Sequence, residues 1–159
     1  MRMAVERLVY VGLSLAVTAR WSESTVRCRT VRRVTIDAWA FYEQYAESDR
    51  SSLSERERQV LAVCDFRQEV NSGGFDSYFR YSGGDTALTA ITALPRLLGS
   101  RWADLLGEAV ALFGAPYPLD PDDRSEKVGS FDLDELDKRF YTLEASTNAD
   151  GKLTEALSN

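Results

Sequence analysis

The sequence contains no histidine, and this absence excludes several kinds of catalytic and metal site. Without an imidazole, neither a Ser-His-Asp triad nor a Cys-His nucleophile can form, and zinc or iron sites lose their commonest nitrogen ligand. Cysteine is also scarce. Cys28 and Cys64 are isolated, so we expect neither a disulfide framework nor a Cys-x-x-Cys metal site. Cys64 lies among aliphatic residues and is expected to be a buried small side chain, not a nucleophile. No cofactor and no metal ligand is predicted.

Long apolar runs are missing as well. The uncharged run Leu8–Ala19 has twelve residues, whereas a helix needs about 20 apolar residues to cross a bilayer. Arg2 and Arg7 precede this run, so a secretory signal is one interpretation. Five arginines follow within residues 20–33, and positive charge just beyond an apolar segment tends to hold that side in the cytoplasm. We therefore favour an irregular Arg-rich extension over residues 1–33 of a cytoplasmic protein. The remaining alternative is a translation start placed upstream of a natural beginning near Val34.

Positive and negative charge are separated along the chain. Residues 1–40 hold seven arginines against three carboxylates, a net of +4, whereas residues 41–159 hold 12 basic against 22 acidic residues, a net of −10. An acidic body repels the phosphates of nucleic acids and membranes and favours basic protein surfaces. The predicted partner is therefore a basic protein, not a nucleic acid or a membrane. The sequence gives no indication of oligomeric state.

From Thr35 onward the apolar residues recur with a helical period, which predicts a single all-α domain over residues 34–145. Residues 146–159 are expected to form a weakly structured tail, and no strand pattern is found. The predicted helices cover residues 36–48, 54–71, 85–95, 100–113 and 132–143. The expected helix starts are Ser54, Asp85 and Ser100. Ser54 is expected to form a capping box with Glu57. Residues expected to face the core include Trp39, Tyr42, Val60, Phe66, Leu88, Trp102, Leu136, Phe140 and Tyr141.

The most specific segment is E-V-N-S-G-G-F-D-S-Y-F, residues 69–79. Its pattern predicts a helix ending at Asn71, a turn in which Gly73 supplies left-handed backbone, and one further helical turn. Phe75, Tyr78 and Phe79 follow at helical spacing and are expected to pack in the core. The Glu69 carboxylate is expected to accept hydrogen bonds from the amides of the turn, a structural role. A binding or catalytic role for Glu69 is the alternative.

This segment resembles the E-V-N-x-G-G-F-x-x-Y-F signature of a bacterial family of small acidic helical proteins, mostly of unknown function, named for a member that acts as a DNA mimic. The resemblance covers roughly residues 35–145. Its motif residues are Glu69, Val70, Asn71, Gly73, Gly74, Phe75, Tyr78 and Phe79, with Asp85 in support. Ser77 and Tyr81 stand where the family more often has Gln and Asn. The resemblance implies an all-helical fold and protein binding, with acidic side chains in place of phosphates, often against a transcription factor.

The most acidic stretch is residues 120–137, with eight carboxylates against Arg124 and Lys127, a net of −6. Its acidic residues are Asp120, Asp122, Asp123, Glu126, Asp132, Asp134, Glu135 and Asp137. A solvated loop with favourable charges at a helix N-terminus is the simplest interpretation. A calcium loop is a poor match, because Ser125 stands where an EF-hand needs glycine. The sharper hypothesis is a binding surface, since carboxylates three or four apart on a helix lie about 5–6 Å apart at Cβ.

Together these features predict a non-enzymatic acidic binding protein, a DNA mimic that engages a basic DNA-binding regulator. One alternative is an immunity-type protein that blocks a basic toxin cleft. The other is an uncharacterised enzyme that uses a pair of carboxylates.

Overall fold

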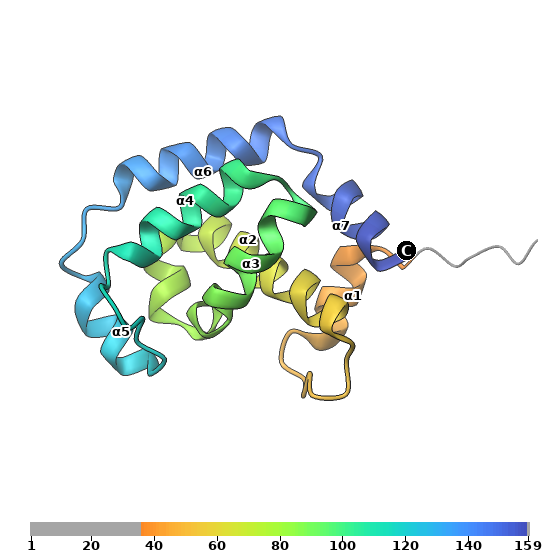
Figure 1. Cartoon of the computed structure of the whole chain (residues 1–159), viewed down its shortest axis with the longest axis horizontal. Helices are drawn as coiled ribbons and strands as arrows, with labels where there is room; N and C mark the ends of the chain where they lie inside the picture. Colours follow the sequence, from red (N-terminus) through yellow and green to blue (C-terminus); the bar gives the residue numbers. More distant parts are fainter. Residues whose placement is uncertain (1–35, 159) are drawn as a thin grey trace, which may run out of the picture. The chain divides into compact units, whose positions relative to one another are not determined.

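The computed structural model describes residues 36–158, which form helices joined by short loops (Figure 1). This part of the chain contains seven α-helices, one 3-10 helix and no strand, so the predicted all-α class is confirmed with two α-helices more than expected. The predicted extension over residues 1–33 lies outside the described residues. In chain order the elements are α1 (Ala38–Tyr45), α2 (Glu55–Arg80), η1 (Ser82–Thr86), α3 (Ala87–Leu97), α4 (Ser100–Ala111), α5 (Pro121–Val128), α6 (Asp134–Ser146) and α7 (Ala149–Ser158).

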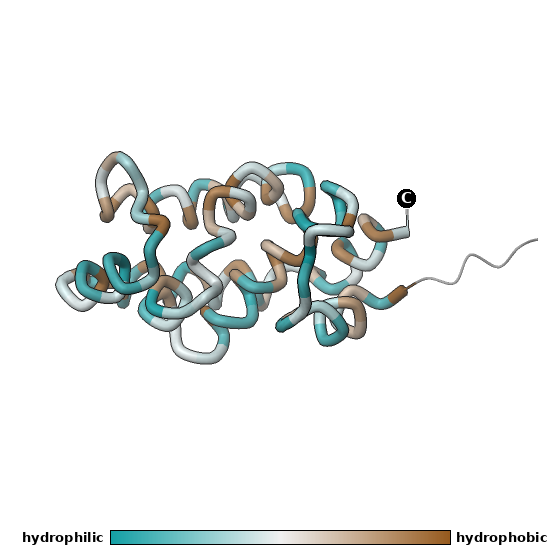
Figure 2. Tube along the Cα trace, turned by 90° about the horizontal axis from the view of Figure 1, so that it is seen from below, coloured by the Kyte–Doolittle hydropathy of each residue, from teal (hydrophilic) through white to brown (hydrophobic). Residues whose placement is uncertain are grey.

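The long helix α2 is the centre of the fold and contacts α1, α3, α5, α6 and α7. Its middle is buried on every side, because all residues from Val60 to Arg67 are shielded from solvent. This stretch is apolar except for Asp65 and Arg67, which form ion pairs, and a helix with so little polar surface must be covered by others. The remaining helices show hydrophobic and hydrophilic residues alternating along the chain, as expected where one side faces this core (Figure 2).

The start of α2 confirms one of the predicted caps. Glu57 N donates to Ser54 Oγ at 3.3 Å, and Ser54 N donates to the Glu57 carboxylate at 2.7 Å, which is the capping box. The other two predicted caps are wrong. No side chain caps α3, which Thr86 precedes, and α4 follows Gly99, so Ser100 is its first helical residue.

Two predicted unstructured regions are helical. Residues 121–128 form α5, where Asp120 accepts hydrogen bonds from the amides of Asp122 and Asp123, and Pro121 occupies the first turn. Its one buried aliphatic residue, Val128, leaves no apolar period for the sequence to show. The predicted weak tail is also wrong for residues 149–158, which form α7 with a fully buried Leu153.

The core is built largely from aromatic side chains. Phe66 of α2 packs against Trp102 of α4 and Phe140 of α6, with ring centroids 6.3 and 5.4 Å away. Three predicted core residues are wrong: Leu88 is 48% exposed, Tyr141 46% and Trp39 36%. Each lies on a helix whose neighbours cover a narrower face than the apolar pattern implies.

Candidate functional site

The two halves of α2 meet at a sharp break at Gly73 and Gly74, where the sequence predicted a turn. Gly74 has a φ of 73°, in the left-handed region that favours glycine, whereas the φ of −159° at Gly73 is extended backbone. The predicted break is therefore confirmed, but its left-handed residue is Gly74 and not Gly73. A Cβ on Gly74 would lie 2.6 Å from Oδ2 of Asp137, so the α6 carboxylate fits closely against the glycine.

Asp137 of α6, and not Glu69, binds the turn. The Phe75 amide donates to Asp137 Oδ1 at 2.8 Å, across a sequence separation of 62 residues. The Glu69 carboxylate instead accepts a hydrogen bond from Ser77 Oγ at 2.9 Å, so its predicted role is wrong. Partial burial raises the pKa of the Asp137 carboxyl above its ordinary value, against the opposing effect of the Phe75 hydrogen bond. Asp137 is therefore a structural link between α6 and α2.

The aromatic residues of the motif are buried, which confirms their predicted structural role. Phe75, Tyr78 and Phe79 have no exposed surface. The Phe75 ring lies 6.3 Å from Phe140 of α6, and the Phe79 ring lies 4.8 Å from Phe113, just after α4. Because these side chains fill the core, the aromatic part of the motif offers no surface for a ligand, whereas Asn71 and Gly73 are exposed.

In the second glycine pair, Gly83-Gly84, the second residue lies against a buried arginine. Arg124 of α5 is fully buried, and its guanidinium donates to the carbonyl oxygens of Phe79 at 3.1 Å and Leu119 at 2.7 Å and to the carboxylate of Asp85. Asp85 therefore serves as the partner of Arg124 and does not cap α3. A Cβ on Gly84 would lie 2.7 Å from Arg124 Nε, so the small residue allows this close approach.

The predicted acidic residues lie around the N-terminal ends of α5 and α6, except for Glu126, which lies in the last turn of α5. Seven of them are exposed, and we call these seven the acidic rim: Asp120, Asp122, Asp123, Glu126, Asp132, Asp134 and Glu135. Asp137 is half-buried and faces inward to Phe75, so it does not belong to the rim. Asp122, Asp123, Asp134 and Glu135 lie in the first turns of their helices, where the helix dipole favours negative charge without a counter-ion.

The acidic rim has few ion-pair partners for a cluster of seven carboxylates. Among the described residues, Glu135 alone of the seven forms an ion pair, with Lys138 at 3.8 Å, and both side chains are exposed. Elsewhere arginines neutralise carboxylates directly: Arg50 contacts Asp65 at 2.6 Å. Arg124, on the same helix as three rim residues, points into the core and does not neutralise them. The rim therefore presents nearly its full negative charge to solvent.

The described residues show little of the apparatus of an enzyme. No group of three or more Cys, Asp or Glu side chains in residues 36–158 is arranged to hold a metal ion. Cys64 is buried as predicted, and burial raises the pKa of its thiol to about 12, which disfavours the nucleophilic thiolate. Within the same residues, no helix has the length and apolar character required to span a membrane.

Comparison with known proteins agrees with the helical fold and the motif. A family model described as DMP19-like protein matches residues 51–158. The match covers more than half of the chain, so the chain belongs to the DMP19-like protein family, the DNA-mimic family that its motif resembles. This is not a known enzyme family. No curated protein and no solved structure matches the chain.

Proposed function

We propose that the protein is a non-enzymatic binding protein of the cytoplasm, and that its acidic rim engages a basic protein surface of the kind that binds DNA. The observation that carries this proposal is the lack of neutralisation at the rim. Six of its seven carboxylates have no ion pair among the described residues, although the same part of the chain contains twelve basic residues. These six carboxylates are therefore available to a partner without the breaking of an internal ion pair.

The spacing and support of the rim suit a DNA mimic. Side chains three or four positions apart on a helix, such as Asp122 and Glu126, lie about 5–6 Å apart at Cβ, broadly like successive phosphates of one strand. Arg124 holds α5 to the core, and Asp137 holds α6 to α2. A surface fixed in this way loses little conformational freedom when it binds.

Reversal of the rim charges tests the proposal. The variant Asp132→Lys/Asp134→Lys/Glu135→Lys is compared with Glu43→Lys/Glu47→Lys/Asp104→Lys, which changes the net charge equally at exposed carboxylates outside the rim that have no described ion pair. Both are used to capture partners from a lysate of the source cells, after circular dichroism has shown that they are folded.

We expect wild type and control to retain a basic partner at low salt and to lose it at about 0.5 M salt, because screening weakens exposed charge pairs. The rim variant should not retain it at any salt concentration. Capture that is indifferent to salt and to the rim substitutions would contradict the proposal.

The captured partner also separates the two kinds of basic target. If the partner is a DNA-binding regulator, duplex DNA should displace the protein from it, because both occupy the same basic groove. If the partner is a nuclease toxin, the protein should block its activity, which is the immunity-type alternative.

A further inference from the structure

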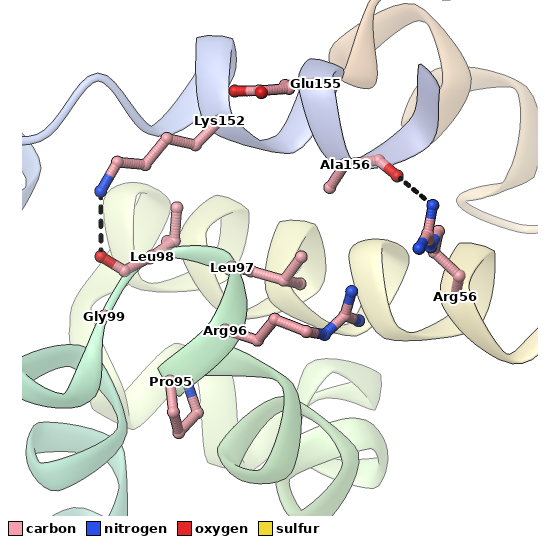
Figure 3. Close-up of a pocket in the computed structure, with 9 residues that line it drawn as sticks. All are labelled: Arg56, Pro95, Arg96, Leu97, Leu98, Gly99, Lys152, Glu155 and Ala156. Carbon is pink, nitrogen blue, oxygen red and sulfur yellow. Dashed lines mark hydrogen bonds between the residues drawn. The ribbon is translucent and has the colours of Figure 1, made fainter. Parts of the chain in front are cut away.

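The described residues also contain a cleft with the opposite charge to the rim. It has a volume of about 430 Å³ and lies between the end of α3, the helix α7 and the start of α2 (Figure 3). Its charged lining residues are the three cations Arg56, Arg96 and Lys152 and one carboxylate, Glu155, and all four are exposed. Figure 3 shows the Arg96 side chain extending beneath α7 toward α2, from which Arg56 projects. The buried side chains of Leu97 and Leu98 contribute an apolar floor.

The three cations are unusual in this acidic domain because none of them forms an ion pair with a described carboxylate. Seven of the twelve basic residues in the described part form ion pairs there. The five that do not are Arg56, Arg96, Arg101, Lys127 and Lys152. Three of these five therefore meet in one cleft, in a region whose net charge is −11.

The cations of the cleft use few of their hydrogen-bond donors. Arg56 donates to the carbonyl of Ala156 at 3.5 Å, Arg96 to the side chain of Gln59 at 2.6 Å, and Lys152 to the carbonyl of Leu98 at 3.3 Å. Each acceptor is neutral. A guanidinium carries five N–H donors and an ammonium three, so most donors here remain for a ligand.

Helix dipoles favour the charge of all three cations. Lys152 and Arg56 contact carbonyls near the C-terminal ends of α3 and α7, where positive charge is favoured by the helix dipole. Arg96 lies in the last turn of α3, where the same effect applies, but its guanidinium donates to the side chain of Gln59 and to no described backbone carbonyl. The dipoles explain why cations are favoured at these helix ends, and they leave open why three cations meet in one cleft.

We propose that this cleft binds a small organic anion, whose carboxylate or phosphate group is held by Arg56, Arg96 and Lys152. Guanidinium groups match the oxygen geometry of both anions and form strong, charge-assisted hydrogen bonds with them. The apolar floor accommodates the carbon skeleton of such a ligand. The negative charge of the rest of the domain disfavours a nucleic acid and leaves a compact anion as the occupant.

Titration of the full chain with citrate and with inorganic phosphate tests this proposal by amide nuclear magnetic resonance. Sodium chloride at matched ionic strength is the reference. We expect saturable chemical-shift changes at residues 96–99 and 152–156 with at least one of the two anions. The anion that binds more tightly shows whether the cleft prefers a carboxylate or a phosphate group. Arg96→Gln should weaken this binding about tenfold, because it removes charge-assisted hydrogen bonds. Lys127→Gln, which removes one unpaired charge on α5, should leave the affinity unchanged.

Lys152→Gln provides a second variant that should weaken binding in the same direction. Shifts no larger than those with sodium chloride, or an equal loss of affinity in Lys127→Gln, would overturn the proposal. The titration needs no protein partner, and its variants lie outside the proposed partner surface or leave the rim carboxylates unchanged. Its failure is therefore distinct from a failure of the function proposed above.

Discussion

Two groups of carboxylates in this domain differ in what arginines do near them. In one group, Arg67 of α2 donates to Glu144 of α6, with an Nε–Oε2 distance of 3.0 Å, and to Asp150 of α7 at 2.7 Å. We call Arg67, Glu144 and Asp150 the paired cluster. In the part of the acidic rim on α5, Arg124 instead points into the core and donates hydrogen bonds to backbone carbonyls.

The comparison shows that net charge alone does not locate a binding surface. The carboxylates of the paired cluster hold α6 and α7 against the central helix, and Arg67 neutralises part of their charge. The carboxylates of the rim have almost no internal role beyond the start of their helices. Carboxylates therefore stabilise helix packing in the paired cluster, whereas in the rim they are available for recognition.

The largest effect is expected for Arg124→Met, which removes the internal anchor beneath the rim. The substitution leaves several buried carbonyls and Asp85 without their donor. Each buried acceptor left without its donor costs about 1–3 kcal/mol, so we expect a loss of about 3 kcal/mol or more of unfolding free energy. Urea unfolding measures the loss. Lys127→Met, an exposed cation on the same helix, should change stability by less than about 0.5 kcal/mol. Equal stability of the two variants would show that Arg124 does not anchor α5.

Gly74→Ala should produce the next largest effect, because it disturbs the link between α2 and α6. Left-handed backbone costs a residue with a Cβ about 1–2 kcal/mol, and here the Cβ would also displace the Asp137 carboxylate. We therefore expect a loss of about 2 kcal/mol or more in thermal or urea unfolding. The control is Gly107→Ala in α4, where a Cβ meets no atom within 4 Å. It should stabilise the protein by about 0.5–1 kcal/mol.

The comparison itself is tested by the same substitution in both regions. Glu144→Gln in the paired cluster removes a charged partner of buried Arg67, which should cost about 1.5–3 kcal/mol. Glu126→Gln in the rim should change stability by less than about 0.5 kcal/mol, since no described residue pairs with it. Urea unfolding of both variants at low salt gives the difference. Similar costs at the two positions would remove the distinction between the regions.

The smallest effect is a pH dependence centred on Asp137. The folded protein holds the Asp137 proton more tightly than the unfolded chain, because burial raises the folded pKa. Stability from this group is therefore present at low pH and is lost as the pH rises through the folded pKa. As pH falls from 7 toward 4, wild type should gain stability relative to Asp137→Asn. The opposite slope in paired urea titrations would show that the Phe75 hydrogen bond outweighs the burial.

Much of the fold was predictable because it depends on local signals. The helical period gave the fold class, Ser54 and Glu57 marked the start of α2, and the glycine pair marked its break. The element that escaped prediction is α5, whose single buried aliphatic residue leaves no periodic pattern. The exposure of Leu88 and Tyr141 was also missed, because the extent of coverage depends on neighbouring helices and not on the helix itself.

The site was predicted less completely, since its details depend on residues distant in sequence. Composition identified the seven rim residues, but the inward turn of Asp137 depends on Phe75, 62 positions away. Arg124 and Asp85 meet across 39 positions. The cationic cleft was not predicted at all, because Arg56, Arg96 and Lys152 come from three separate helices and share no motif.

The hydrogen bond between the Phe75 amide and Asp137 makes that amide a natural reporter. It lies in the core helix, yet its acceptor stands on α6, two positions after the rim residue Glu135. A partner that pulls or rotates the first turn of α6 must lengthen or shorten this bond. The proton resonance and exchange rate of one backbone amide will therefore register an event at the surface from inside the protein, without any label.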